Sequence, residues 1–151
     1  MFDIRQANLD DLDVLVQLRL ALLHEAELQE DEPTLVTTAI RDYLIQALAT
    51  GEFVGFVGES DRSIIGTSGV VFFKRPPHYG SLSGVEAYIM NIYTLPQWRG
   101  KGVATALMAE TLNFIRKTEA RRIWLQTTEA GKPLYEKFGF TSTANEMELL
   151  L

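Results

Sequence analysis

The most constraining feature of this sequence is the junction at residues 91–104, which reads N-I-Y-T-L-P-Q-W-R-G-K-G-V-A. An apolar, β-prone run over residues 85–95 stops at Pro96, and a helical pattern follows the turn. Within the turn, Gly100 and Gly102 let backbone N–H groups approach a ligand without a Cβ in the way. Because a helix N-terminus offers unpaired N–H groups and partial positive charge, this junction predicts a phosphate site.

Two basic side chains, Arg99 and Lys101, add positive charge to the turn of a chain whose net charge is −6. The turn fits neither common nucleotide-binding pattern, because residues 100–105 read G-K-G-V-A-T. The third glycine of G-x-G-x-x-G is missing, and the P-loop pattern G-x-x-x-x-G-K-[ST] is not met. We interpret the turn as a pyrophosphate site of another kind. The alternative is an ordinary glycine-rich strand-to-helix turn with two exposed basic residues.

Three residues of the turn, Arg99, Gly102 and Ala104, match the signature R-x-x-G-x-[GA], and here the chain resembles the GNAT superfamily of N-acetyltransferases. A second stretch, L-Y-E-K-F-G-F at residues 134–140, resembles the family's L-Y-x-x-x-G-F segment. The resemblance covers essentially the whole chain and is most specific over residues 89–140. It implies an enzyme that transfers acetyl from acetyl-CoA, its co-substrate, to a primary amine of a small molecule or peptide, by direct attack in a ternary complex.

The resemblance also implies which residues contact acetyl-CoA. The turn would hold the pyrophosphate, and the preceding strand would pair with the pantetheine arm and offer a backbone N–H to the carbonyl oxygen, worth about 3 kcal/mol. The implied cofactor-binding residues are Ile92, Tyr93, Thr94, Arg99, Gly100, Lys101, Gly102, Val103, Ala104, Thr105 and Thr128. The chain departs from the family at Thr128 and Gly131, where many members have Asn and Ala. A threonine hydroxyl could substitute for the amide.

Tyr135, in the second motif, is implied to be the general acid. When an amine attacks the thioester, the leaving thiolate needs a proton or a hydrogen bond. A phenol with a pKa of ~10 is protonated at neutral pH and can supply it. The alternative is a packed tyrosine whose hydroxyl bonds to the backbone.

Glu86 is the candidate general base. A primary alkylamine has a pKa of ~10 and arrives protonated, so a carboxylate on the central strand could take its proton directly or through water. Glu86 lies 13 residues before Arg99, and histone-acetylating family members look to have their base at that spacing. The alternative is an exposed strand carboxylate. Because the family's strand carries a bulge, the sequence does not decide which face of the strand Asn91 occupies. Asn91 could hold a water or the substrate.

Two features near the expected acceptor side each allow two interpretations. Five acids between Glu25 and Glu32 form either a solvated helix end or an acidic flank that attracts a cationic amine. Arg19 interrupts the apolar stripe of the first helix. It either reaches water while its stem packs, or holds an acid near the substrate site.

The periodicity predicts one α/β domain over residues 1–151 in the order β-α-α-β-β-β-α-β-α-β. With the family resemblance, we expect a GNAT-like mixed sheet of six to seven strands, splayed at its centre and flanked by about four helices. Strands are expected at residues 2–7, 53–58, 64–73, 85–95 and 122–128, with one or two closing strands from Phe140 onward. Helices are expected after Asn8 and at residues 35–50, 103–118 and 131–138.

Composition excludes several classes. No run reaches about 18 apolar residues and no signal peptide is visible, so we expect a cytoplasmic protein without membrane contact. With no Cys and two His, no metal site is expected, and the net charge of −6 argues against nucleic-acid binding. The apolar run at residues 147–151 could be an internal strand or part of the interface of a homodimer, since dimers are common in the family that the chain resembles. Two other functions stay open: a non-catalytic acyl-CoA-binding regulatory module, and an interaction domain that has lost the cofactor.

Overall fold

The protein is described by a computed structural model that covers residues 1–26 and 31–151. Its centre is one sheet with the strand order β1-β2-β3-β4-β5. The strands are β1 (Asp3–Gln6), β2 (Phe53–Ser60), β3 (Ser63–Lys74), β4 (Val85–Thr94) and β5 (Arg122–Trp124). Strands β1 to β4 pair antiparallel with one another, and β5 is parallel to β4, so the sheet is mixed, as predicted.

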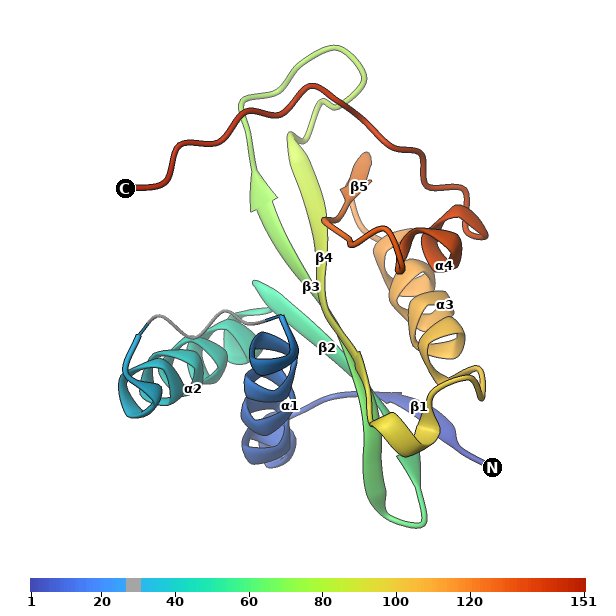
Figure 1. The fold of residues 1–151 in the computed structure, drawn as a ribbon. Helices are drawn as coiled ribbons and strands as arrows, with labels where there is room; N and C mark the ends of the chain where they lie inside the picture. The colour runs from blue at the N-terminus through green and yellow to red at the C-terminus, as the bar shows by residue number, and fades with distance from the viewer. Residues whose placement is uncertain (27–30) are drawn as a thin grey trace.

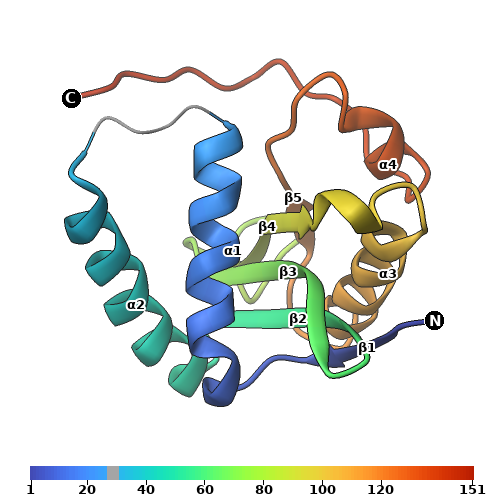
Figure 2. The ribbon, with the colours of Figure 1, turned by 60° about the horizontal axis from the view of Figure 1, so that its bottom comes forward.

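Helices cover both faces of this sheet (Figure 1). They are α1 (Leu12–Glu25), α2 (Pro33–Thr50), α3 (Val103–Ile115) and α4 (Lys132–Glu136), with short 3₁₀ turns at Leu9–Asp11 and Pro96–Trp98. Figure 2 shows α1 and α2 on one side of the sheet and α3 and α4 on the other. The described part of the chain thus has the α/β layering that the sequence predicts.

The limits of α2 follow from local sequence. Pro33 stands at the first helical position, where its missing N–H costs nothing. The Glu32 carboxylate accepts a 3.0 Å hydrogen bond from the Leu35 backbone N–H and so caps the first turn. Gly51 ends the helix with φ of +79°, the left-handed conformation expected of a C-terminal glycine.

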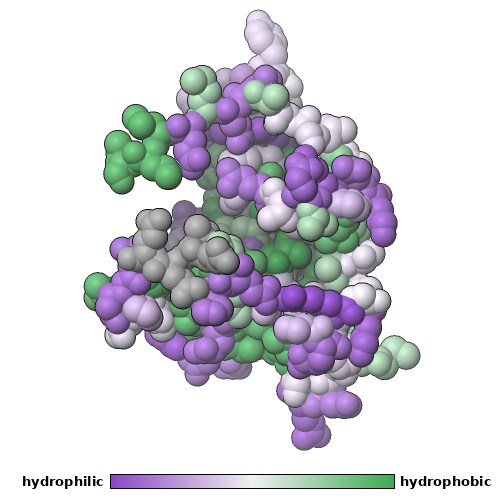
Figure 3. Space-filling model, in the orientation of Figure 1, coloured by the Kyte–Doolittle hydropathy of each residue, from purple (hydrophilic) through white to green (hydrophobic). Residues whose placement is uncertain are grey.

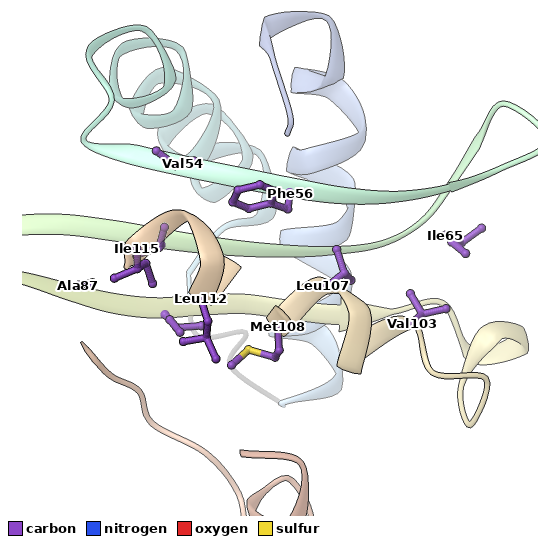
Figure 4. Packing of buried hydrophobic residues seen from close by; sticks show 11 residues of the cluster. Val54, Phe56, Ile65, Ala87, Val103, Leu107, Met108, Leu112 and Ile115 are labelled. Carbon is purple, nitrogen blue, oxygen red and sulfur yellow. The ribbon is translucent and has the colours of Figure 1, made fainter. Parts of the chain in front are cut away.

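The hydrophobic core has two parts, one on each face of the sheet. Between α3 and the sheet, buried residues of the helix meet those of β2, β3 and β4 (Figure 4). The α3 residues in this cluster are Val103, Leu107, Met108, Leu112 and Ile115. A second cluster joins α1 and α2 to the other face through Val16, Leu44 and Phe53. Because α3 is anchored along its length, the turn before it is held in a fixed place beside the end of β4.

The prediction of six to seven strands is wrong for the described residues, which contain five. Residues 140–151, expected to form closing strands, have no helix or strand, and β5 ends at Trp124 instead of residue 128. The cause is the lack of a backbone partner, since none of the described strands lies beyond β5. The central strands do part: β4 and β5 pair only over residues 86–88 and 122–124, leaving residues 89–94 unpaired on that side.

Candidate active site

A cleft of about 1100 Å³ opens where β4 and β5 part. Its walls come from the end of α1, the second half of β4, the turn before α3, and residues 126–135. Eleven predicted site residues line it: Ile92, Tyr93, Thr94, Arg99, Gly100, Gly102, Val103, Ala104, Thr105, Thr128 and Tyr135. Lys101 and Glu86 are not among the lining residues. The fold therefore gathers most of the predicted site, from three separate stretches of sequence, around one cavity.

A bulge in β4 shapes the middle of this cleft. The pairing of β3 with β4 shifts register between Thr67 and Gly69, and opposite this point Asn91 has φ of +56°. Asparagine tolerates this left-handed conformation better than most residues. An Arg19 guanidinium N–H donates a 2.8 Å hydrogen bond to Asn91 Oδ1, which ties α1 to the bulge. Burial lowers the pKa of Arg19, and among the described residues no carboxylate forms an ion pair with it.

The turn before α3 has the conformation that its glycines predict. Gly100 has φ of +75° and Gly102 has φ of +84°, values that side chains with a Cβ rarely adopt. The space where each Cβ would stand is open within 4 Å. Among the residues that the structure describes, no side chain caps α3, whose first backbone bond runs from the Ala106 N–H to the Gly102 carbonyl oxygen. The N–H groups of the first helical turn are therefore available to an anion.

Arg99 is held at the edge of this turn by contacts that the sequence did not reveal. Its Nε donates to the Thr94 carbonyl oxygen at 3.0 Å, and its terminal nitrogen donates to both carboxylate oxygens of Glu25 at 2.9 Å. The Tyr93 hydroxyl also donates to Glu25, at 2.9 Å. The hydrogen bonds from Arg99 and Tyr93 lower the pKa of Glu25, whereas burial and then Glu25 raise the pKa of Tyr93. Glu25 appeared in the sequence only as part of an acidic run.

Lys101 stands beside the cleft, not in its wall. Its Nζ lies 5.0 Å from the centre of the Trp98 ring, close enough for a cation–π contact. Trp98 itself lines the cleft, so the ammonium group stays next to the turn and its charge reaches the same region. The positive charge predicted for this turn is thus present on two side chains. Arg99 is held by its hydrogen bonds, and Lys101 is held by its contact with Trp98.

Tyr135 lines the cleft from α4. Burial raises the pKa of its phenol above the ordinary value of 10.0. Its ring packs edge-on against Phe140, with 6.1 Å between the ring centres. Among the hydrogen bonds of the described residues, none involves the Tyr135 hydroxyl, which the packed alternative would pair with the backbone. Tyr135 is thus half-buried in the wall of the cleft, and its phenol is protonated at neutral pH, two properties that a proton donor needs.

Glu86 lies near the start of β4, with its side chain 5% exposed, so the alternative of an exposed strand carboxylate is wrong. Arg75 Nε lies 2.8 Å from its Oε2, and Arg122 donates to its Oε1 at 3.0 Å. Both carboxylate oxygens are therefore already bonded to guanidinium groups. The role of Glu86 as a base stays a prediction, and these contacts do not support it.

The departure from the family at residues 128 and 131 has a local cause. A Cβ added at Gly131 would lie 2.3 Å from the Thr127 hydroxyl oxygen, so alanine would not fit without a shift. The Thr128 hydroxyl accepts a 3.3 Å hydrogen bond from the Gly131 backbone N–H while lining the cleft. Thr128 thus ties this loop together, and its contact with the pantetheine arm stays a prediction.

The acidic run at the end of α1 is only partly described. Glu27 and Glu30 lie outside the described residues, whereas Glu25 pairs with Arg99 and Glu32 caps α2. The two described acids with assigned contacts are therefore used within the protein. Whether the rest of the run attracts an amine stays a prediction.

Comparison with known proteins gives the same family as the sequence motifs. The model of the acetyltransferase (GNAT) family matches residues 15–140. N-alpha-acetyltransferase 30 of Schizosaccharomyces pombe is 32% identical over 92 residues, which are 59% of this chain and 57% of that protein. Probable N-acetyltransferase family 8 member 5 of Mus musculus is 28% identical over 125 residues, 72% of this chain and 52% of that protein. The chain thus spans just over half the length of these curated relatives.

Solved structures agree over nearly the full length. A predicted acetyltransferase from Clostridium acetobutylicum, crystallised with acetyl-CoA, has a TM-score of 0.91 and 29% identity, covering 99% of this chain and 96% of that one. A GCN5-related N-acetyltransferase from Ralstonia eutropha has a TM-score of 0.86 and 27% identity, covering 100% and 99%. With the glycine turn, the parted strands and the family match on one chain, this protein belongs to the GNAT family of acetyltransferases.

Proposed function

We propose that the protein transfers the acetyl group of acetyl-CoA to a primary amine of a small molecule or peptide, by direct attack within a ternary complex. The observation that carries this proposal is the single cleft that joins the open glycine turn, the unpaired edge of β4 and the Tyr135 hydroxyl. The open glycine turn suits a pyrophosphate, and the unpaired edge of β4 suits an extended chain with amide groups. The Tyr135 hydroxyl suits a leaving thiolate.

Acetyl-CoA would lie with its pyrophosphate on the N–H groups of residues 102–105, next to Arg99 and Lys101. Its pantetheine arm would follow the backbone of residues 92–94, where β4 has no strand partner on the β5 side. Thr94 supports this placement, because its buried hydroxyl oxygen has no hydrogen-bond partner among the described residues. A polar group of the ligand would give that oxygen the partner that buried hydroxyls normally have.

In the proposed reaction the nitrogen lone pair of the neutral amine attacks the thioester carbonyl carbon. A backbone N–H of the bulged part of β4 stabilises the negative charge that develops on the carbonyl oxygen. The carbon–sulfur bond then breaks, and the thiolate takes the proton of the Tyr135 hydroxyl. The proton released by the amine goes to water in the cleft, which returns one to Tyr135.

This proposal is tested by a thiol-release screen with acetyl-CoA and a panel of polyamines, amino acids, aminoglycosides and peptide N-termini. We expect release of free coenzyme A that depends on at least one class of amine. Binding of acetyl-CoA without thiol release from any amine would instead favour the non-catalytic acyl-CoA-binding module. No binding at all would contradict both.

A cytoplasmic location stays a prediction. None of the described helices is long and apolar enough to cross a membrane.

We expect the variant Glu86→Gln to keep kcat within about threefold and to lose about 1–3 kcal/mol of unfolding free energy, because two guanidinium groups lose a charged partner. Urea unfolding and steady-state kinetics measure the two effects. The matched control is Glu110→Gln, on the exposed face of α3. A loss in kcat of about 100-fold with unchanged stability would restore Glu86 as the general base.

A further inference from the structure

The charged side chains of the cleft include one without a charged partner. Among the described residues that line the cleft, the charged ones are Arg19, Glu25 and Arg99. Glu25 and Arg99 pair with each other at 2.9 Å. Arg19 is half-buried and donates a 2.8 Å hydrogen bond to Asn91 Oδ1, and none of the described carboxylates forms an ion pair with it. Because a charge taken partly out of water is costly unless it is paired, this guanidinium favours an anionic ligand.

The part of the cleft around Arg19 is largely apolar. The lining residues one turn further along α1 and on either side of Asn91 in β4 are Leu22, Leu23, Tyr88, Ile89, Met90 and Ile92. Figure 3 shows the molecule hollowed near the centre of this face, with hydrophobic residues, coloured green, in the depth of the hollow. An ion pair formed in such surroundings is stronger than one in bulk water, because the local dielectric constant is lower.

Two tyrosines lie close enough to Arg19 for its charge to act on them. They are Tyr43 on α2 and Tyr88 on β4. Burial, the larger effect, raises the pKa of both phenols, and the positive charge of Arg19 opposes that rise. Both phenols therefore stay protonated at neutral pH and do not neutralise the guanidinium. The cation at this place is thus surrounded by uncharged rings and not by a counter-ion.

Asn91 sets the position of Arg19 relative to the proposed reaction. It directly precedes residues 92–94, whose backbone would hold the pantetheine arm, and it forms the bulge beside which the thioester would lie. A group bound to Arg19 would therefore be close to the attacking amine. Only an acceptor with a short chain between its amine and its anionic group fits this spacing. A carboxylate suits the site best, because its two oxygens match the planar fork of a guanidinium.

We propose that Arg19 binds the carboxylate of the acceptor, and that the acceptor is a free α- or β-amino acid. This inference rests on the proposed acetyl transfer and narrows its acceptor class. Polyamines and aminoglycosides have no carboxylate, and at a peptide N-terminus the corresponding carboxyl group is an uncharged amide. The alternative is that Arg19 only holds the bulge of β4 in place through Asn91.

The test compares each acceptor as its free acid and as its primary amide. Thiol release from acetyl-CoA is measured with leucine, phenylalanine and β-alanine and with the amides of the three. We expect wild-type kcat/KM to be at least ~10-fold higher for the free acids, the usual effect of a hydrogen-bonded charged pair. Loss of the carboxylate lowers the pKa of the neighbouring amine, so more of the amide is in the reactive neutral form. The expected preference therefore runs against the reactivity of the amine.

The variant Arg19→Gln should remove this preference. We expect kcat/KM for the free acids to fall by about 10- to 100-fold, mainly through KM, and kcat/KM for the amides to stay within about threefold. Arg19→Lys keeps the charge without the planar fork and should keep part of the preference. The control Arg41→Gln removes a guanidinium from α2 that pairs with Asp13 outside the cleft lining, and it should keep the wild-type ratio of acid to amide.

Three results would overturn the carboxylate site. An equal fall for acids and amides in Arg19→Gln would mean that Arg19 only holds the bulge. Wild-type turnover of amines without any preference for free acids would exclude the site and leave acetyl transfer intact, and this comparison needs no variant to fold. Faster turnover of O-phosphoethanolamine than of β-alanine would mean that the bound anion is a phosphate.

A binding measurement separates this inference from the proposed function. N-acetylleucine and its amide are titrated calorimetrically into the protein saturated with coenzyme A. Binding of the acid at least ~10-fold tighter than the amide, lost in Arg19→Gln, would support the carboxylate site even if no amine gave thiol release, a result that would contradict acetyl transfer alone. Equal binding of acid and amide, or binding of neither, would overturn the site.

Discussion

Replacing Arg99 with glutamate should weaken acetyl-CoA binding by about 100-fold. A hydrogen bond between charged groups contributes about 1.5–3 kcal/mol, which is roughly 10- to 150-fold in affinity. The variant loses this bond and places a negative charge beside the pyrophosphate. Lys101 does not take its place, because its ammonium group is held over the Trp98 ring. Isothermal titration with acetyl-CoA measures the effect.

The variant Arg99→Glu also changes a contact within the protein, because Arg99 pairs with Glu25. In the free protein Arg99 bonds to both carboxylate oxygens of Glu25, so Arg99→Glu would set two carboxylates side by side. The double variant Arg99→Glu/Glu25→Gln removes that repulsion and should bind as weakly as the single variant. The control Lys117→Glu makes the same change in net charge at an exposed position after α3 and should bind normally. Affinity within about threefold of wild type in Arg99→Glu would remove the pyrophosphate assignment.

The parts of the fold that sequence predicted correctly are those set by local chemistry. The turn requires positive φ at residues 100 and 102, and both residues are glycine, which adopts positive φ without steric cost. Apolar residues recur at strand spacing before the turn and at helical spacing after it, so the sequence also predicted the order of strand and helix correctly. The same holds for α2, where Pro33 and Gly51 mark the two ends.

The parts that sequence missed depend on contacts between distant residues. Glu25 and Arg99 are 74 positions apart, and no spacing pattern indicates that they pair. Glu86 was correctly placed on the strand before the glycine turn, but its two arginine partners come from the preceding loop and from β5. Residues 147–151 have the composition of a strand but form none, because composition does not supply a neighbouring strand to pair with. These cases share one cause: each depends on whether a partner is present elsewhere in the fold.

Tyr135→Phe should lower kcat by about 10²- to 10⁴-fold, the usual contribution of a positioned proton donor, because the thiolate would then leave without a proton. Acetyl-CoA affinity should stay within about threefold, since the ring and its contact with Phe140 remain. The control is Tyr79→Phe, which removes the same hydroxyl from a fully exposed tyrosine in the loop after β3. Unchanged turnover in Tyr135→Phe would exclude the acid role.

The pH dependence of kcat separates proton donation from a merely structural effect of the hydroxyl. A general acid works only in its protonated form, so the rate must fall as the pH rises through its pKa. Burial raises the pKa of Tyr135, which moves that fall above the ordinary value of 10.0. Wild-type kcat should therefore show no loss from this group at neutral pH and should decline only in strong alkali, whereas Tyr135→Phe should lack the decline. A hydroxyl that only positioned the substrate would lower kcat without setting the alkaline limb, because its effect does not require transfer of the proton.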